Sequence, residues 1–414
     1  MFERVLPTKS LFLPDQLHHM TSDSLEKAYT PIRLRGLELR NRFIKSATYE
    51  GMTDGGYPTP LLTEHHRRLA QGGVGLTTIA YGAVSPEGRT NRQQLLIDDR
   101  LAAYARQLTD AIHSEGGKCM LQLTHCGYFT KNQDLRFKRS LEPSARINLY
   151  GILGGIIMSR SMTEHDMQGM ARNFAASASF AQSVGFDAVE IHMGHGYLLS
   201  QFLSPRINRR KDAYGGSVSN RMRFPLEVVE AVRQTVGEDY PIVCKINLED
   251  GFRGGLTIRD SAEAAKALEK EGVDVLVLSG GFTSITPFYL MRGDVPLWEM
   301  VRAEKDIAQK MAMVLFGKFI MRRFAFEENF FMPMALKIRE AVAMPLAYLG
   351  GVCSRQGIER AMEEGFDMIA LARAVIHDPD FLLKIRDGRV SVSECNHCNI
   401  CVAEMDRGGV KCVI

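Results

Sequence analysis

Eight apolar, strand-like runs separated by segments of helical period constrain the fold of this chain more than any other feature of its 414 residues. The runs lie at 42–48, 75–81, 118–124, 188–193, 242–247, 275–281, 345–352 and 368–374. The helical patterns lie at 98–115, 165–184, 221–236, 259–271 and 354–364. Alternation of this kind is typical of a parallel sheet built from βα units. Eight units predict the α/β class and a (β/α)8 TIM barrel.

The predicted barrel spans residues 30–390, between an irregular arm at 1–29 and a short cysteine-rich tail at 391–414. A doubly wound dinucleotide-binding sheet is the alternative, but no glycine fingerprint follows the first strand. Insertions follow the third strand, at 130–161, and the sixth, at 282–333. The second insertion is rich in Met, Phe and Arg, which predicts a lid over the barrel in preference to an amphipathic helix that faces a membrane.

Composition and charge exclude several classes of protein. A hydrophobic content of 45% and a charged content of 24% are ordinary for a globular chain with a sizeable core. The net charge of +3 is too small to indicate binding to nucleic acid. Because the sequence shows neither a signal peptide nor a continuous apolar run of about 18 residues, we expect a cytoplasmic protein with no membrane span.

The end of the fourth strand carries the most distinctive chemistry in the sequence. His192, His195 and Tyr197 stand there, around the chain breaks at Gly194 and Gly196. Two imidazoles and a phenol can donate several hydrogen bonds to one oxygen and hold a proton beside it. We therefore predict that these three residues are catalytic.

A phosphorylated cofactor is predicted to lie across the mouth of the barrel. Gly350 and Gly351 end the seventh strand and Arg373 ends the eighth, so backbone N–H groups can approach a phosphate and a guanidinium can hold it. A phosphate site in these two loops is common in TIM barrels. Gln122 and Lys245, at the ends of the third and fifth strands, would lie beneath the ring of the cofactor.

Four cysteines cluster near the end of the sequence: Cys395, Cys398, Cys401 and Cys412. An unexported chain is expected to keep its cysteines out of disulfides, so the cluster indicates a metal or redox centre. Four thiolates close in sequence can hold a 4Fe-4S cluster or a zinc ion. The 4Fe-4S cluster is the prediction, zinc and free thiols are the alternatives, and His397 is a further candidate ligand.

Three stretches strongly resemble the Old Yellow Enzyme family of FMN-dependent ene reductases, a group of NADH:flavin oxidoreductases. They are TPIRLRGLELRNRFIKSAT at 30–48, QGGVGLTTIAYGAVSPEGR at 71–89 and HGYLLSQFLSPRINRRKDAYGGSVSNRMRFPLEVV at 195–229. The resemblance extends from about residue 30 to residue 380, which is nearly the whole predicted barrel. It implies the TIM-barrel fold, an FMN cofactor and NAD(P)H as the reductant.

The resemblance also implies a role for each matching residue. His192 and His195 would bind the carbonyl oxygen of an α,β-unsaturated carbonyl or enoate, and Tyr197 would give a proton to its Cα while flavin N5 gives hydride to Cβ. The residues that match flavin-binding positions are Ala47, Thr48, Tyr49, Tyr81, Gln122, Lys245, Gly350, Gly351, Ala372 and Arg373.

Three of these positions depart from the family's pattern. Lys245 replaces an arginine near flavin N1 and O2, which keeps the positive charge but loses the planar fork of donors. Tyr49 stands where relatives often carry Thr, Cys or His beside flavin O4, and Ala372 replaces a common glycine. The redox potential of the flavin is therefore expected to differ from that of other members.

The cysteine tail resembles the cluster loop of the 2,4-dienoyl-CoA reductase and trimethylamine dehydrogenase branch of the same family. This likeness keeps a second function open, an iron-sulfur-coupled flavin dehydrogenase that passes electrons to a partner protein. A third is a non-catalytic flavin-binding protein whose insertion at 282–333 docks a partner. A homo-oligomer is left open as well.

Overall fold

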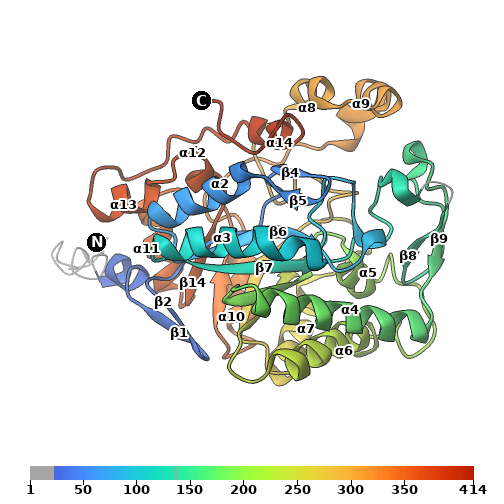
Figure 1. The fold of residues 1–414 in the computed structure, drawn as a ribbon, viewed down its shortest axis with the longest axis horizontal. Coiled ribbons are helices and arrows are strands. Elements are labelled where there is room, and N and C mark those ends of the chain that lie inside the picture. Colours follow the sequence, from blue (N-terminus) through green and yellow to red (C-terminus); the bar gives the residue numbers. More distant parts are fainter. Residues whose placement is uncertain (1–22, 136–137) are drawn as a thin grey trace, which may run out of the picture.

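The computed structural model describes residues 23–135 and 138–414 and contains a closed barrel of eight parallel strands (Figure 1). The strands are β3 (Phe43–Lys45), β6 (Leu76–Ala83), β7 (Lys118–Thr124), β10 (Ala188–Met193), β11 (Ile242–Asn247), β12 (Val275–Ser279), β13 (Leu346–Tyr348) and β14 (Met368–Leu371). They follow one another around the barrel in chain order, and β14 pairs with β3 to close it. The predicted TIM barrel is confirmed.

Several strands are shorter than the apolar runs that predicted them. β3 covers three residues of the run at 42–48, and β13 covers three of the run at 345–352. The residues that follow these strands leave the sheet and line a cavity at the barrel mouth, among them Ala47 after β3 and Leu349 and Val352 after β13. An apolar run in the sequence marks burial, whereas a strand ends where its ladder of hydrogen bonds ends.

Helices cover the outside of the barrel. The longer ones in this layer are α2 (Pro60–Gln71), α3 (Ala102–Ser114), α4 (Glu164–Ser183), α6 (Val218–Val236), α7 (Ile258–Lys270), α10 (Met332–Arg339) and α11 (Arg355–Glu363). Helix α4 begins at a capping box in which Thr163 and Asp166 satisfy each other's backbone N–H groups. It packs against α6, as α2 packs against α3. Each helix buries an apolar face on the strands, which fixes the orientation of the barrel wall.

Two hydrophobic cores result from this arrangement. The larger core lies between the strands and the helices. The smaller core fills the barrel and includes Ile44, Met120 and Val243. A hairpin of β1 (Ile32–Leu34) and β2 (Leu37–Leu39) adds leucines to the inner core and closes the end of the barrel opposite the mouth. The predicted arm at 1–29 is helical at 23–28, and residues 1–22 lie outside the described part.

The two insertions form separate structures at the mouth end. The first holds β8 (Ser140–Glu142) and β9 (Ser159–Ser161), and the second holds α8 (Leu297–Ala303) and α9 (Ile307–Ile320). Parts of the second insertion pack tightly, since Phe282 and Phe331 are buried. Helix α9 does not, because Gly317 is its one buried residue. The lid over the barrel stays a prediction for α9.

No helix in the described residues is long and apolar enough to cross a membrane. The short helices α5 (Leu198–Leu203), α12 (Arg373–His377), α13 (Phe381–Arg386) and α14 (Ile400–Glu404) complete the fold. Of these, α5 follows the fourth barrel strand and α12 follows the eighth, so each begins at the mouth, where the predicted site lies.

Candidate active site

The three predicted catalytic residues lie together at the end of β10. The imidazole of His192 is 4.9 Å from that of His195 and 4.6 Å from the ring of Tyr197, measured between ring centroids. His195 has φ of +58°, a left-handed conformation that non-glycine residues rarely adopt. Its backbone N–H donates to Asn247 Oδ1 at 2.9 Å, which holds the turn in this conformation.

Both imidazoles are neutral at physiological pH. Burial, reinforced by the charge of Lys245, lowers the pKa of His195 to about 3. Burial and the neighbouring His195 and Lys245 lower the pKa of His192 in the same direction. The backbone N–H of Gly194 donates to Nδ1 of His192 at 3.3 Å, so Nε2 carries the proton of the neutral ring. His192 can therefore act as a hydrogen-bond donor through Nε2.

His195 is less free to donate than the sequence suggests. Its Nε2 is 2.7 Å from Oγ of Ser279, the last residue of β12. One of its two ring nitrogens is thus shared with a protein hydroxyl, which fixes the orientation of the ring. Ser279 is a site residue that the sequence did not predict, although it ends a barrel strand.

Tyr197 stands in a buried aromatic cluster at the first residue before α5. Its ring lies 5.4 Å from Tyr81 and 5.6 Å from Phe129, and Tyr49 lies 5.6 Å from Tyr81. Burial raises the pKa of Tyr197 far above its usual value, so the phenol keeps its proton. A phenol held in this state can deliver a proton to a neighbouring atom that develops negative charge.

Beneath this group, Glu190 joins two of the predicted flavin-binding residues. Its Oε1 accepts from Nε2 of Gln122 at 2.6 Å and from Nζ of Lys245 at 2.9 Å. Lys245 also donates to Oγ of Ser46 at 3.2 Å. The sequence analysis missed Glu190, although an acid within an apolar strand is a signal, because a buried carboxylate requires partners.

A cavity at the ends of β13, β14 and β3 brings together half of the ten residues predicted to bind the flavin. The predicted residues that line it are Ala47, Thr48, Gly351, Ala372 and Arg373. Gly351 has φ of +83°, and a Cβ there would lie 2.6 Å from the ring of Phe330. Only glycine is accommodated at this position, which keeps the backbone open to a ligand.

Arg373 contacts the tail through one nitrogen. Its Nη1 donates to the backbone oxygen of Arg292 at 2.7 Å and to Oδ1 of Asn399 at 2.8 Å. Both of its hydrogen bonds to described residues use Nη1, so Nε and Nη2 remain for an anionic ligand. Asn399, like Ser279, is a site residue that the sequence did not single out.

These residues fit an FMN. Arg373 and the glycine turn meet the needs of a phosphate, and the apolar cavity wall suits a planar ring. Lys245 and Gln122 offer a cation and a carboxamide, which match the pyrimidine edge of a flavin. Oε2 of Glu190 is buried without a partner among the described residues, an indication that the site is completed by a bound group or water.

Tyr49, whose ring lies 5.6 Å from that of Tyr81, does not line the cavity of Ala47 and Arg373. It lines a neighbouring cavity together with Lys131, Gln309 and Asp406, where the two insertions and the tail approach one another. Burial, with Asp406 nearby, raises the pKa of Tyr49 to about 12. The phenol is therefore a neutral group between the ring cavity and this second opening.

The four cysteines of the tail line one small cavity with Arg373 and His377. Sγ of Cys412 is 3.1 Å from Nδ1 of His377. Among the described residues, one group of three His, Cys, Asp or Glu side chains has its ligand atoms all within 4.8 Å of one another. It consists of His113, Cys119 and Asp187 and includes no residue of the tail. No three of the four tail sulfur atoms are therefore that close, whereas a tetrahedral zinc site holds its sulfur atoms about 3.8 Å apart.

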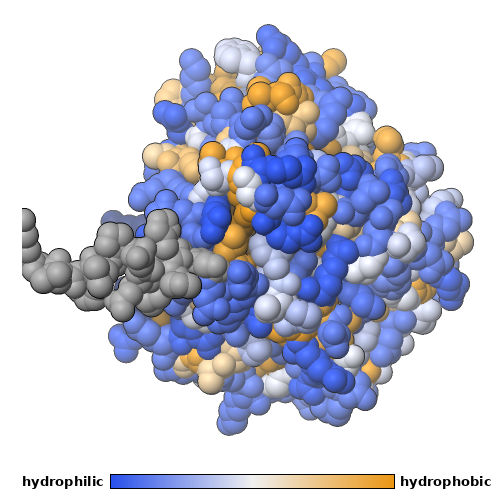
Figure 2. Space-filling model, turned by 90° about the vertical axis from the view of Figure 1, so that its left-hand side faces the viewer, coloured by the Kyte–Doolittle hydropathy of each residue, from blue (hydrophilic) through white to orange (hydrophobic). Residues whose placement is uncertain are grey.

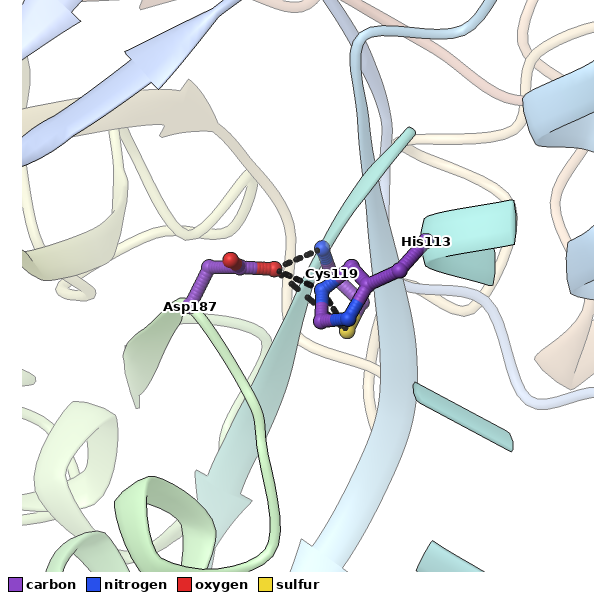
Figure 3. Close-up of side chains that lie close together, drawn as sticks. All are labelled: His113, Cys119 and Asp187. Atoms are coloured by element: carbon purple, nitrogen blue, oxygen red, sulfur yellow. Dashed lines mark hydrogen bonds and ion pairs between the residues drawn. The ribbon is translucent and has the colours of Figure 1, made fainter. Parts of the chain in front are cut away.

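Figure 3 shows the group of His113, Cys119 and Asp187. Cys119 lies near the start of β7 and Asp187 just before β10, at the end of the barrel opposite the mouth. Nε2 of His113 is 2.8 Å from Oδ2 of Asp187, and Lys118 is 3.1 Å from Oδ1. The backbone N–H of Cys119 donates to the same Oδ2 at 2.9 Å. The carboxylate is already saturated with donors.

The same arrangement recurs twice around the barrel with no metal-binding chemistry. Asp274 accepts from the backbone N–H of Ile242 at 2.7 Å and pairs with Arg233. Asp367 accepts from the backbone N–H of Leu346 at 3.0 Å and pairs with a helix arginine in the same way. In each case an aspartate just before one strand ties down the start of the preceding strand. We conclude that Asp187 is a structural clamp in which His113 takes the place of the arginine.

The sequence matches the profile of one protein family and several known relatives. The profile of the NADH:flavin oxidoreductase / NADH oxidase family matches residues 27–285. A 4,4'-dithiodibutanoate disulfide reductase of Rhodococcus erythropolis is 38% identical over 396 residues, which are 95% of this chain and 96% of that protein. An NADH oxidase of Thermoanaerobacter brockii is 32% identical over 89% of this chain, which spans 52% of that protein.

Solved structures show the same fold at lower identity. A 2-naphthoyl-CoA reductase in complex with 2-naphthoyl-CoA has a TM-score of 0.74 at 23% identity, with 92% of this chain and 58% of that chain covered. A morphinone reductase in complex with tetrahydroNAD has a TM-score of 0.68 at 22% identity, with 90% and 96% covered. The match thus covers nearly the full length of the second chain and little more than half of the first.

Proposed function

Since the chain belongs to the NADH:flavin oxidoreductase / NADH oxidase family, we propose that it is an FMN-dependent NAD(P)H oxidoreductase that reduces the C=C bond of an α,β-unsaturated carbonyl or enoate. The observation that carries this proposal is the trio of His192, His195 and Tyr197, two neutral imidazoles and a protonated phenol at one strand end. Neutral donors beside a proton source suit a substrate oxygen that gains charge while a neighbouring carbon gains a proton.

FMN, when bound, supplies the two-electron chemistry, with the nicotinamide nucleotide as its reductant. The residues of the chain hold and polarise the substrate. Nε2–H of His192 donates to the substrate carbonyl, and the ring of His195 is oriented for the same oxygen by Ser279. The phenol oxygen of Tyr197 holds the proton that the substrate Cα receives. Lys245, paired with Glu190, keeps a positive charge beneath the site without charging the imidazoles.

Replacing Tyr197→Phe tests the assignment of the proton donor. We expect reduction of the bound flavin by NAD(P)H to continue at nearly the native rate, and reoxidation by an enone to slow on the order of 10²-fold to 10⁴-fold. Anaerobic stopped-flow absorbance measures both half-reactions. Tyr150→Phe is the matched control, because Tyr150 is also a tyrosine of this cluster, 4.3 Å from Phe129. Native rates of both half-reactions in Tyr197→Phe would contradict the assignment.

Reduction of a disulfide is a second candidate function. It is favoured by the 38% identity with a disulfide reductase over 95% of this chain. The two candidates are separated by comparing turnover of cyclohexenone with turnover of 4,4'-dithiodibutanoate at equal concentration. An ene reductase favours the enone and depends on Tyr197, whereas a disulfide reductase favours the dithio acid.

We further propose that the tail cysteines hold a 4Fe-4S cluster. The proposal is supported by the position of Cys395, Cys398, Cys401 and Cys412 around one cavity with wider spacing than a zinc site needs. Anaerobically purified protein is expected to contain about four iron and four sulfide per chain and to lose both in Cys398→Ser. Zinc without sulfide in the native protein would contradict the cluster.

A further inference from the structure

Helix α9 turns its apolar residues outward. Ile307, Met311, Leu315 and Phe319 follow one another at intervals of four, so they form one stripe along the helix. Their side chains are 76%, 59%, 60% and 82% exposed. Gly317 is the residue that faces the protein, and a Cβ there would lie 2.5 Å from Leu297. A surface helix ordinarily buries such a stripe, so α9 has the reverse orientation.

A second apolar patch lies on the first insertion. Its exposed members are Ile147, Leu149, Ile152, Leu153, Ile157 and Met158. Lys131 connects the two regions: its backbone oxygen is 3.4 Å from the Cβ position of Gly154, and its Nζ is 3.3 Å from Oε1 of Gln309 in α9. Both regions also appear at the same corner of the molecule in Figure 1. The two patches lie near one another beside the mouth, with the polar pair of Lys131 and Gln309 between them, and we refer to them together as the mouth-side surface.

This surface differs from the face of the molecule drawn in Figure 2. The face shown in Figure 2, at the left-hand side of Figure 1, is largely hydrophilic, with hydrophobic residues scattered among polar ones. Contiguous exposed apolar surface in a folded protein marks an interaction site. Trp298 of α8, next to α9, is 54% exposed, and tryptophan is enriched at the boundary between membrane and water.

The charges around the surface identify what covers it. Residues 307–326 contain no acidic residue, and three of their cations, Lys310, Lys318 and Arg322, make no ion pair with a described residue. Arg323 pairs with Asp294, and the two arginines of residues 143–163 pair with Glu142 and Asp166. An anionic lipid headgroup layer offers the opposite charge together with an apolar interior.

We propose that α9 and the first insertion dock this protein onto an anionic phospholipid surface, with the apolar stripe inserted at the headgroup level. The net charge of the chain is only +3, so the attraction depends on where the charges are placed and not on their total. The cavity lined by Tyr49, Lys131 and Gln309 lies between the docked segments and the barrel. The active site would then open beside the bilayer surface.

Vesicle co-sedimentation of the full-length flavin-loaded protein tests the proposal. We expect the protein to sediment with phosphatidylcholine vesicles that contain phosphatidylglycerol, and less with pure phosphatidylcholine. The variant Ile307→Gln, Leu315→Gln and Phe319→Gln is expected to lose on the order of tenfold or more in partitioning. The matched control, Leu61→Gln, Tyr104→Gln and Val392→Gln, removes three apolar side chains that are 59%, 46% and 54% exposed elsewhere and should bind as the native protein does.

Two results would overturn the proposal. One is vesicle binding by the α9 variant that equals that of the native protein. The other is a native protein that fails to bind either kind of vesicle. If, in that case, sedimentation equilibrium shows a dimer that the α9 variant dissociates, the surface belongs to a second copy. Lys310→Gln with Lys318→Gln checks the charge: it should weaken binding to the phosphatidylglycerol vesicles and leave the melting temperature unchanged.

Discussion

The two ends of the barrel are built on different plans. At the closed end, Asp187, Asp274 and Asp367 repeat one device, a carboxylate that bonds a strand's backbone and a helix's basic side chain. At the mouth, each strand ends in a different residue. Oε2 of Glu190 and Nε2 of His125 there are buried without partners among the described residues. The repeated, fully paired aspartates stabilise the scaffold. The polar atoms at the mouth that lack a partner are available to bind a ligand.

The largest effect on stability is expected at the mouth, from Lys245→Met. The change leaves Glu190 as an unpaired buried charge, which costs about 3–5 kcal/mol. Denaturant unfolding measures this loss, and flavin absorbance after desalting measures cofactor retention, which should also fall. Lys245→Arg keeps the charge and should recover most of both. If Lys245→Met is as stable as the native protein, the ion pair of Lys245 and Glu190 does not contribute to the free energy of unfolding.

A buried histidine at the mouth, His125, should also make the free energy of unfolding depend on pH. Burial lowers the pKa of His125 to about 4, below its value of about 6.5 in the unfolded chain. Between these values the unfolded state binds a proton that the folded state does not. Stability is therefore complete above about pH 6.5 and falls as the pH drops toward 4, by up to about 3 kcal/mol from this residue. His125→Gln should flatten the pH dependence of unfolding over that window, and an unchanged slope would contradict it.

At the closed end, Asp274→Asn should weaken the scaffold and leave the chemistry intact. The amide keeps a hydrogen bond to Ile242 but loses the charge that pairs with Arg233, at a cost of about 2 kcal/mol. The melting temperature should fall, while turnover per flavin stays native. A loss of turnover larger than the loss of folded protein would show that the two ends are coupled and would weaken the contrast between them.

The smallest effect is expected from Cys119→Ala at the clamp of Asp187. Because we interpret the clamp as structural, the variant should bind the same amount of zinc as the native protein, and zinc should shift both melting temperatures equally. Metal analysis after dialysis against zinc measures this. A loss of one zinc per chain would make the group of His113, Cys119 and Asp187 a metal site and remove the parallel with Asp274.

Much of the fold could be predicted from the sequence because an apolar period is a local property. The strand ends could not, since residues such as Ala47 remain apolar beyond the sheet where they line a cavity. The meeting of His192, His195 and Tyr197 was predictable from their place at a strand's end, but their partners Ser279 and Asn247 come from other strands. Such contacts depend on register around the barrel, which no local pattern contains.

The insertions show a second limit. The period of α9 predicts a helix with an apolar stripe, but it does not indicate whether that stripe faces inward or outward. The closed-end clamps were visible as a repeat of Gly-x-Asp at 185–187, 272–274 and 365–367. Their meaning became clear only when each aspartate was seen against the backbone of a neighbouring strand.

The bond between Arg373 and Asn399 has a consequence for how the protein is made. The barrel closes only when β14 pairs with β3, and the guanidinium of Arg373 is held by a residue of the tail. During translation, therefore, the chain must leave the ribosome as far as Asn399 before Arg373 has both of these supports. A ribosome stalled before residue 399 would carry a nascent barrel that lacks the tail's support for Arg373.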